Sequence, residues 1–422
     1  MNLGLIVSLV VAAIAAGPGQ SGQLQWFKGN THTHSWWSDG DSPPETVVGW
    51  YKEHGYDFLV LSDHNGLSEG TKWINPEKST KATAATRYEK KYGPGWVETG
   101  PPPGKTEGPT YWRAKPLSEV RAFFEEPGKF LLIPGEEVSA AFEKHPVHLC
   151  AFNLKDAVPS QTGKDVTETI QNNVSAVIEQ SAKTGILMLA QINHPNFKWG
   201  LTAENIMPTK DVTFMEVHNG HGGVANVGDE QHPSVEYIWD VVLTRRLGEL
   251  NLPIIYGTAA DDAHAFTTEG PGGAHPGRGW VMVRARYLTP EKILKAMQKG
   301  DFYASTGVVL KDVKFDGHAL SVEIQPKPGV TYRTQFIGTL TGYDTRTSPR
   351  GPDPKAELTL KYSDDVGKVL SEQTGTEANY KLTGNELYVR AKVISSAKQS
   401  NPSVEGDLET AWVQPVRPQP GK

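Results

Sequence analysis

The chain has 422 residues, of which 37% are hydrophobic and 21% charged, and its formal net charge is −6. This length allows a large core and two or more domains. No segment is rich in Lys and Arg, which excludes a basic nucleic-acid-binding surface. The single cysteine, Cys150, excludes an intrachain disulfide and lies in an apolar run typical of a buried core residue.

The N-terminus opens with an uninterrupted run of apolar and small residues from Leu3 to Ala16. The run is too short to span a bilayer comfortably, and Ala13-Ile14-Ala15 fits the small-x-small rule for signal cleavage. We therefore predict a signal peptide over residues 1–15, a secreted or periplasmic protein, and no membrane span after cleavage. Because no Lys or Arg precedes the run, a retained N-terminal anchor helix is the alternative.

From Leu24 to about Ala285, short apolar runs alternate with helical patterns, as in β/α units around a parallel sheet. The predicted strands are 24–27, 58–61, 130–133, 147–152, 186–192, 212–217, 253–256 and 280–283. The predicted helices include 44–54, 117–126, 165–183 and 234–247. Seven or eight such units indicate a barrel, in which ligands gather at the C-terminal ends of the strands.

Residues 71–115 interrupt this rhythm with a proline triplet, several glycines and six aromatic residues. A segment of this length inside a barrel is usually functional or disordered. We expect either a substrate-shaping lid over the barrel mouth or a solvated insertion whose aromatic side chains lie against the barrel flank.

Beyond Gly307 the pattern changes to β-type runs separated by turn residues. The predicted strands are 320–324, 331–336, 356–362 and 387–394. They predict a small C-terminal β-sandwich over residues 308–422, with a structural role or an oligomer contact as its expected function and polymer binding as the alternative.

Polar residues follow the predicted strands at the ends where a barrel binds its ligands. His32 and His34 come first and, at i and i+2 on a strand, point to one face, where they could share one divalent cation. The same placement recurs along the chain at Asp39, Asp63-His64, Glu136-Glu137, His148, His194, Glu216 to Asn219, and Asp261 to His264. A single His beside a strand is usually structural, but this recurrence predicts a metal site.

These motifs resemble the polymerase and histidinol phosphatase (PHP) superfamily of metal-dependent phosphoesterases. The resemblance is carried, in family order, by His32-Thr33-His34 with Asp39, Ser62-Asp63-His64, Gly135-Glu136-Glu137-Val138-Ser139, His148, His194-Pro195 and Asp262-Ala263-His264. Residues 279–307, followed by a β-domain, resemble the secreted branch with carbaryl-hydrolase-like members.

The resemblance implies an α/β fold in which a distorted (β/α)7 TIM-like barrel, residues 24–307, precedes the small β-sandwich. It implies up to three divalent metal ions. The first would be held by His32, His34, Glu137 and Asp262, the second by Glu137, His148 and His194, and the third by Asp39, His64 and His264. Zinc, manganese or iron would suit these ligands.

The leading hypothesis is a secreted metal-dependent hydrolase of phosphomono- or diesters, with a metal-bridging hydroxide as the nucleophile. Hydrolysis of a carbamate, amide or carboxyl ester on the same metals is the nearest alternative, and a non-catalytic extracellular binding protein is another. Candidates for orienting ligands, protonating the leaving group or holding a substrate anion are Asp63, His218, His221, His275, Arg278 and Lys198, each of which could equally be structural.

Overall fold

The structure, a computed structural model, describes residues 22–77, 81–351 and 358–418. The predicted signal peptide, residues 1–15, lies outside these ranges. Within them, no helix is both long and apolar enough to cross a membrane.

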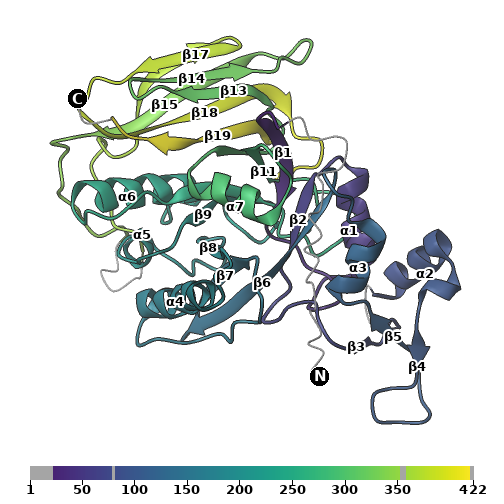
Figure 1. Cartoon of the computed structure of the whole chain (residues 1–422). Helices are drawn as coiled ribbons and strands as arrows, with labels where there is room; N and C mark the ends of the chain where they lie inside the picture. Colours follow the sequence, from purple (N-terminus) through teal and green to yellow (C-terminus); the bar gives the residue numbers. More distant parts are fainter. Residues whose placement is uncertain (1–21, 78–80, 352–357, 419–422) are drawn as a thin grey trace, which may run out of the picture.

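Seven strands of the N-terminal part lie side by side in one large sheet (Figure 1). They are β1 (Gln25–Asn30), β2 (Phe58–Leu61), β6 (Leu131–Phe142), β7 (His145–Phe152), β8 (Leu189–Ile192), β9 (Phe214–Asn219) and β10 (Tyr256–Ala260). A parallel bridge between Thr33 and Ala263 joins the chain just after β1 to the chain just after β10. The two ends of the row therefore meet at the C-terminal ends of their strands.

Helices follow most of these strands. They are α1 (Pro44–Glu53), α3 (Leu117–Phe124), α4 (Val166–Thr184), α5 (Ala203–Ile206) and α6 (Val235–Gly248), with α7 (Pro290–Gln298) farther on. The longest, α4, begins where the Asp165 side chain accepts a hydrogen bond from the Glu168 amide and ends at Gly185, whose φ of 71° suits glycine. These local signals explain why the predicted helix bounds lie close to the observed ones.

The predicted alternation of strand and helix fails between β6 and β7. These strands form an antiparallel hairpin, and β7 also runs antiparallel to β8. Only Glu143 and Lys144 separate the two strands, and Glu143 has a φ of 51°. So short a connection can join only antiparallel neighbours. The protein thus has a mixed α/β fold built on a large sheet.

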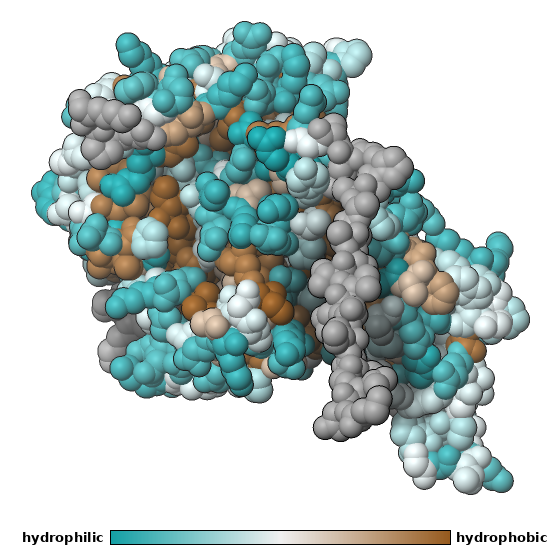
Figure 2. All heavy atoms as spheres, viewed as in Figure 1, coloured by the Kyte–Doolittle hydropathy of each residue, from teal (hydrophilic) through white to brown (hydrophobic). Residues whose placement is uncertain are grey.

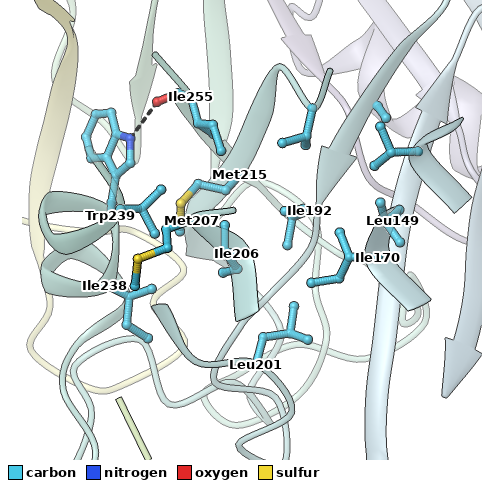
Figure 3. Close-up of a cluster of buried hydrophobic side chains, with 14 of the residues drawn as sticks. Leu149, Ile170, Ile192, Leu201, Ile206, Met207, Met215, Ile238, Trp239 and Ile255 are labelled. Carbon is cyan, nitrogen blue, oxygen red and sulfur yellow. Dashed lines mark hydrogen bonds between the residues drawn. The ribbon is translucent and has the colours of Figure 1, made fainter. Parts of the chain in front are cut away.

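The main hydrophobic core lies between the helices and β7–β9 (Figure 3). Ile170 of α4 packs with Leu149 of β7 and Ile192 of β8, and all three are fully or almost fully buried. Trp239 of α6 is fully buried too, and its Nε1 donates a hydrogen bond to the Ile255 carbonyl at 2.8 Å. Burial of side chains this size stabilises the fold by about 1.5–3 kcal/mol each, which holds the strand ends in place.

The sheet continues into the C-terminal part. Beyond β1 come β11 (Trp280–Ala285), β12 (Phe302–Ser305), β19 (Leu408–Val416), β18 (Glu386–Lys398), β15 (Tyr332–Leu340) and β16 (Lys368–Thr374). A separate sheet holds β13 (Leu310–Phe315), β14 (Ala319–Ile324) and β17 (Glu377–Lys381). Both sheets share one hydrophobic cluster, and their outer surface is mostly hydrophilic (Figure 2). Since β12 pairs with β19, one sheet crosses the predicted domain boundary at residue 307.

The strand predicted over residues 356–362 is absent from its described part, residues 358–362, while 356 and 357 lie outside the described ranges. The backbone here bonds to the α5 region instead. Thr359 Oγ1 accepts a hydrogen bond from the Ala203 amide at 3.0 Å, and the Leu360 amide donates to Glu204 Oε1 at 3.1 Å. Among the described residues, the β-type pairing of this segment is limited to one isolated antiparallel bridge between Lys361 and Ser348.

The described part of the 71–115 insertion has its own small fold, which projects from the body in Figure 1. It contains β3 (Lys72–Ile74), α2 (Lys81–Tyr92), a 3-10 turn (Pro94–Trp96), β4 (Thr99–Gly100) and β5 (Tyr111–Ala114). Tyr88 and Trp112 are buried with Trp36, which follows the paired histidines. The insertion is therefore anchored beside that loop.

Candidate metal centre

The paired histidines after β1 point into a buried pocket of carboxylates. Both His32 and His34 have no exposed surface. His32 Nε2 lies 3.3 Å from Glu137 Oε1 and 3.3 Å from Asp262 Oδ1. His34 Nε2 lies 3.2 Å from the same Asp262 oxygen. The strand alternation that suggested a shared face thus brings both rings to one pair of carboxylates.

Glu137, in the middle of β6, is the hub of the cluster. Its Oε1 lies 3.1 Å from His148 Nδ1 and 3.1 Å from His194 Nε2, while its Oε2 lies 2.7 Å from His64 Nδ1. Its neighbour Glu136 faces the other side of the strand, where it accepts a hydrogen bond from the Val158 amide at 2.8 Å. One carboxylate therefore reaches histidines from four segments of the chain.

A second carboxylate, Asp39, lies at the more open side of the cluster. Its side chain is 59% exposed, and its Oδ1 lies 3.2 Å from His264 Nε2. Its Oδ2 lies 3.6 Å from His64 Nε2, and His34 Nδ1 lies 3.8 Å from Oδ1. This side of the cluster is the one that a substrate in solution can reach.

Four groups of ligand atoms are close enough to hold a metal ion each. They are His34, Asp39, His64 and His264; His32, Glu137 and His194; His32, His34 and Asp262; and His64, Glu137 and His148. Within the described ranges, these groups consist of the nine predicted ligands and no other residue. The set Asp39, His64 and His264 that the resemblance implies for the third metal is found here with His34 added. The residues that it implies for the first and second metals are grouped differently in the structure.

The residues fit divalent cations for a reason that the structure itself shows. His32 Nε2, His34 Nε2 and Glu137 Oε2 are buried and make no well-directed hydrogen bond, although such atoms normally make one. Their nearest polar neighbours are other ligand atoms of the cluster, such as His64 Nδ1 at 2.7 Å from Glu137 Oε2. His194 and Asp262 have φ values of 23° and 50°, which are unusual for residues other than glycine. Ligand atoms that face one another without well-directed hydrogen bonds, together with backbone strain at the same point, favour a site that cations complete.

The charges within the cluster depend strongly on one another. Burial opposes charge on His32, but Asp262 and the other acidic groups around it outweigh burial and raise the pKa of His32 well above its usual value. Burial, with the nearby His264, lowers the pKa of His34 to about 4. Burial would raise the pKa of Glu137, but His32 and its other histidine partners hold it well below the usual range. The carboxylates of the cluster are therefore ionised, and nearby positive charge stabilises them.

A further carboxylate, Glu216 of β9, fixes the histidines from behind; it was counted among the strand-end residues of the sequence, but no role was predicted for it. It accepts a hydrogen bond from His32 Nδ1 at 2.8 Å and from the His194 amide at 2.7 Å. With its proton on Nδ1, His32 keeps the Nε2 lone pair free for a metal. Asn193 similarly donates to Glu137 Oε1 at 2.9 Å. Both residues follow the strand-end pattern, but sequence alone does not distinguish supports from ligands.

The predicted candidate His218 does not reach the centre. The pairing of β9 with β10 shifts by one residue between Glu216 and His218, which reverses the facing of the residues beyond the shift. His218 stacks on Trp412 of β19, with ring centroids 5.6 Å apart. Asn219 points inward instead and donates to Asp262 Oδ2 at 3.1 Å. Because of this bulge in β9, Asn219 and not His218 faces the metal centre.

Asp63 has a positioning role. Its Oδ1 accepts hydrogen bonds from the Ser35 amide at 2.8 Å and from Ser38 Oγ at 2.6 Å. Ser38 Oγ in turn lies 3.3 Å from His34 Nδ1. The carboxylate is 1% exposed and holds the loop that carries His34, so it is not available to protonate a leaving group.

Arg278 also has a structural role, contrary to its predicted role as an anion clamp. The side chain is fully buried. Its guanidinium donates to the carbonyls of Gly220, Gly270, Gly273 and Asn401 and to Asn401 Oδ1. All five N–H groups of an arginine can be used in this way, which leaves none for a substrate.

The remaining candidates differ in their distance from the centre. His275 is buried, and its Nδ1 donates to the Ala265 carbonyl at 3.1 Å, which is a loop contact. Lys198 is exposed. His221 does border the centre, because its ring centroid lies 5.5 Å from that of His264. Of these three residues, His221 is the one placed to meet a substrate.

No family model matches the chain, and no curated protein matches it. Among solved structures, it is similar to a two-domain protein from Bacteroides vulgatus containing a predicted PHP-like metal-dependent phosphoesterase (14% identity, 94% of this chain and 97% of that one, TM-score 0.36). It is also similar to a protein from Bifidobacterium adolescentis described as a metal-dependent phosphoesterase (12% identity, 57% of this chain and 88% of that one, TM-score 0.29). A third is an amidohydrolase from Chromobacterium violaceum with bound sulfate and no metal (13% identity, 56% of this chain and 88% of that one, TM-score 0.26). The first of these three is described as PHP-like; because all three TM-scores are below 0.5, the case for function rests on side-chain geometry.

Proposed function

We propose that the chain is a secreted metal-dependent phosphoesterase of the PHP type, whose barrel is a distorted ring of the seven strands β1, β2 and β6–β10. The C-terminal strands would form its small β-sandwich. The observation that supports this most is the convergence of nine imidazole and carboxylate side chains, in which the buried atoms His32 Nε2, His34 Nε2 and Glu137 Oε2 face other ligand atoms and make no well-directed hydrogen bond. A bound cation would satisfy such atoms.

The chain's residues would hold two or three divalent cations among the four groups of ligand atoms. Asp39, Glu137 and Asp262 supply three negative charges against the four to six positive charges of such cations, so the pocket would attract anions. When bound, the cations supply Lewis-acid charge and lower the pKa of water. Imidazole and carboxylate ligands suit zinc, manganese or iron.

His221 is the side chain best placed to donate a hydrogen bond to a bound substrate. The Gly223 amide donates a hydrogen bond to His221 Nδ1 at 2.8 Å, so a neutral ring carries its hydrogen on Nε2. Burial and the neighbouring histidines lower the pKa of His221, which favours that neutral form. The Nε2–H group could therefore hydrogen-bond to the leaving oxygen.

Two lysines of the insertion favour a phosphoester over an uncharged ester. Lys72 Nζ donates to the Trp37 carbonyl, and Lys81 Nζ donates to the Gly40 carbonyl at 2.9 Å. Both contacts lie on the loop that carries Asp39. Cations beside the open side of the centre would attract a phosphate and stabilise its charge in the transition state.

The test is hydrolysis of three probes by mature protein loaded with Mn²⁺ or Zn²⁺: nitrophenyl phosphate, bis-nitrophenyl phosphate and a nitrophenyl carbamate. Phosphoester turnover should appear and be lost in His32→Ala. A matched control is His54→Ala, because His54 is an exposed histidine stacked on Trp50. Carbamate turnover alone would contradict the phosphoesterase and favour the carbamate or amide hydrolase. Silence on all probes with metal bound would favour a binding protein.

Secretion has its own test, because residues 1–15 lie outside the described ranges. Expression of the full chain in a bacterium should place mature protein in the periplasm or medium, with the first residues missing in its intact mass. A membrane-bound product of full mass would instead support the retained anchor helix.

A further inference from the structure

A cavity of about 770 Å³ lies beside β1, apart from the metal centre. Its lining comes from β1, from the end of α1 and the residues after it, from residues 265–280 and from residues 400–405. None of the nine candidate metal ligands takes part in this lining. The cavity is therefore a separate site, which the metal chemistry does not use.

Four aromatic side chains of the lining follow one another along the wall. The ring centroid of Trp50 lies 6.2 Å from that of Tyr56 and 6.3 Å from that of Phe266. The Tyr56 centroid in turn lies 6.3 Å from that of Trp280. A cavity with apolar walls and few polar groups is the usual form of a small-molecule site. Walls made of aromatic rings favour a ligand that is itself an aromatic ring.

One amine reaches this aromatic wall from β1. Lys28 Nζ lies 3.8 Å from the ring centroid of Tyr56 and 4.2 Å from that of Trp280. Lys28 lines the cavity and is partly exposed. Among the described residues, its Nζ has no hydrogen-bond or ion-pair partner, yet it is not one of their fully enclosed unpaired atoms. The amine is therefore open to a molecule in the cavity.

The two acidic groups that attract Lys28 are engaged elsewhere. Asp57 Oδ2 accepts a hydrogen bond from the backbone amide of Lys28 at 2.7 Å. Asp261 accepts hydrogen bonds from Tyr51 Oη and from the amides of residues 277–279. Burial therefore outweighs the attraction of Asp261 and Asp57 and lowers the pKa of Lys28 to about 8.

This lowered pKa changes what the amine can do. At pH 7.5 roughly a quarter of such amines are neutral, against about one in a thousand for a lysine of ordinary pKa. The neutral amine is a nucleophile, and lysines desolvated by apolar surroundings are those that form Schiff bases with carbonyl compounds. Lys28 is thus suited to react with a carbonyl group.

The other polar groups of the cavity favour an uncharged ligand. Glu269 and Glu405 line it and are exposed, so they would repel an anion, whereas Lys28 would repel a cation. The two histidines of the lining are engaged with the backbone. His54 Nδ1 bonds to the Trp50 carbonyl at 2.7 Å, and His275 Nδ1 bonds to the Ala265 carbonyl at 3.1 Å.

We propose that this cavity binds a neutral aromatic aldehyde, which Lys28 holds as an imine while the aromatic ring lies against Trp50 and Phe266. The neutral amine adds to the carbonyl carbon, and the product then loses water. The amine gives up two hydrogens, the carbonyl oxygen leaves with them, and a C=N bond replaces the C=O bond. No oxidant or reductant takes part, and hydrolysis reverses the step.

The test is reductive trapping on the whole zinc-loaded protein at pH 7.5. Benzaldehyde and sodium cyanoborohydride convert an imine into a stable benzyl group, which peptide mass mapping assigns to one lysine. We expect Lys28 to be labelled about tenfold faster or more than the exposed Lys129 and Lys164, because far more of its amine is neutral. With acetaldehyde, which has no ring, the preference for Lys28 should be smaller.

Two variants test the parts of the site separately. Lys28→Arg keeps a positive charge beside the two rings but cannot form an imine, so labelling at this position should vanish while Lys129 is labelled as before. Trp50→Leu removes a wall that does not touch the amine. It should slow the labelling of Lys28 by benzaldehyde and leave its labelling by acetaldehyde unchanged. Circular dichroism establishes that each variant folds.

A purely structural Lys28, which only braces Tyr56 and Trp280, gives different results. Labelling of Lys28 no faster than that of Lys129, or the same preference for Lys28 with benzaldehyde as with acetaldehyde, would overturn the proposal. Because the label is read as mass on a lysine, the result does not depend on whether the metal centre is active.

Discussion

The metal centre and a second cluster of charged side chains among the described residues differ in what balances their carboxylates. At the junction of α6 and β18, Asp240 and Glu236 are paired with Arg390 and Lys392. At the metal centre, histidines are the only ionisable partners of Glu137, Asp262 and Asp39 among the described residues, with no Lys or Arg paired to them. The junction cluster carries its own permanent cations, and the metal centre does not.

The two clusters therefore differ in how their carboxylate oxygens are satisfied. Every carboxylate oxygen of Asp240 and Glu236 accepts a hydrogen bond, although Arg390 Nη1 has no partner, whereas Glu137 Oε2 makes no well-directed hydrogen bond and has a histidine nitrogen, His64 Nδ1, at 2.7 Å. Buried charges are tolerated when they are paired and hydrogen-bonded. The junction cluster is therefore a structural tie, whereas the metal centre needs cations from solution. Substitutions in the two clusters test that contrast.

The largest effect should come from Glu137→Gln, which removes the negative charge at the hub. We expect loss of bound metal and a fall in kcat/KM for nitrophenyl phosphate of about a thousandfold or more. Elemental analysis and steady-state kinetics measure both. The matched control is Glu136→Gln, next along β6 but facing Val158. Equal damage by both variants would contradict the role of Glu137.

Arg390→Met should destabilise the fold without harming the chemistry. It leaves Asp240 buried without its bidentate partner, so the free energy of unfolding should fall by about 3–5 kcal/mol. Urea denaturation measures this change. The metal content and kcat of the folded fraction should stay at wild-type values. Loss of metal from folded protein would show that the two clusters are coupled.

Glu216→Gln should weaken metal binding while leaving all nine ligands in place. The amide accepts a weaker hydrogen bond from His32 Nδ1, and changes behind a metal ligand typically cost about 10–100-fold in metal affinity. Competition against a chelating dye measures the affinity. Glu236→Gln, the same change in the junction cluster, should leave it unaltered. Identical affinities for wild type and Glu216→Gln would contradict the support role.

The smallest effect concerns acid stability at the junction. Burial would raise the pKa of Glu236, but Arg390 and Lys392 outweigh it and lower the pKa to about 2. The resulting stability is present above the ordinary pKa of about 4.5 and is lost as the pH falls towards 2. Glu236→Gln should thus cost about 2 kcal/mol at pH 7 and progressively less below pH 4.5.

Unfolding free energies of wild type and Glu236→Gln at pH 7, 4.5 and 3.5 measure this trend. Asp240, whose pKa burial raises and Glu236 raises further, is present in both proteins, so the difference reports Glu236 together with its effect on Asp240. A difference that stays constant or grows with acid would contradict the pairing.

The sequence was sufficient for much of the fold because local signals marked the elements. Phe58–Leu61 is an apolar run bounded by turn residues, and it is β2 without any shift. The strand at 147–152 was predicted, but its antiparallel direction was not, since that direction depends on the two-residue turn at Glu143 and not on hydrophobic pattern. The strand predicted near Thr359 failed because that residue bonds to the Ala203 amide from far along the chain.

For the site, the sequence predicted which residues gather at the centre better than it predicted the roles of the residues around them. All nine predicted ligands lie together, because histidine and carboxylate spacing on strand ends is a local property that the sheet preserves. The surrounding roles depend on tertiary contacts. A one-residue bulge turned His218 outward, and the loop carbonyls that occupy Arg278 come from distant segments. Such contacts leave no local trace in the sequence.

The most direct test of the central claim is the number of metal ions bound by the purified mature protein. Metal-free protein would be titrated with Zn²⁺ or Mn²⁺ at neutral pH and its bound metal counted by elemental analysis after dialysis, beside Glu137→Gln. The account predicts two to three ions per chain in the wild type and a clear loss in the variant. Fewer than one ion per chain, or equal counts in both proteins, would contradict it.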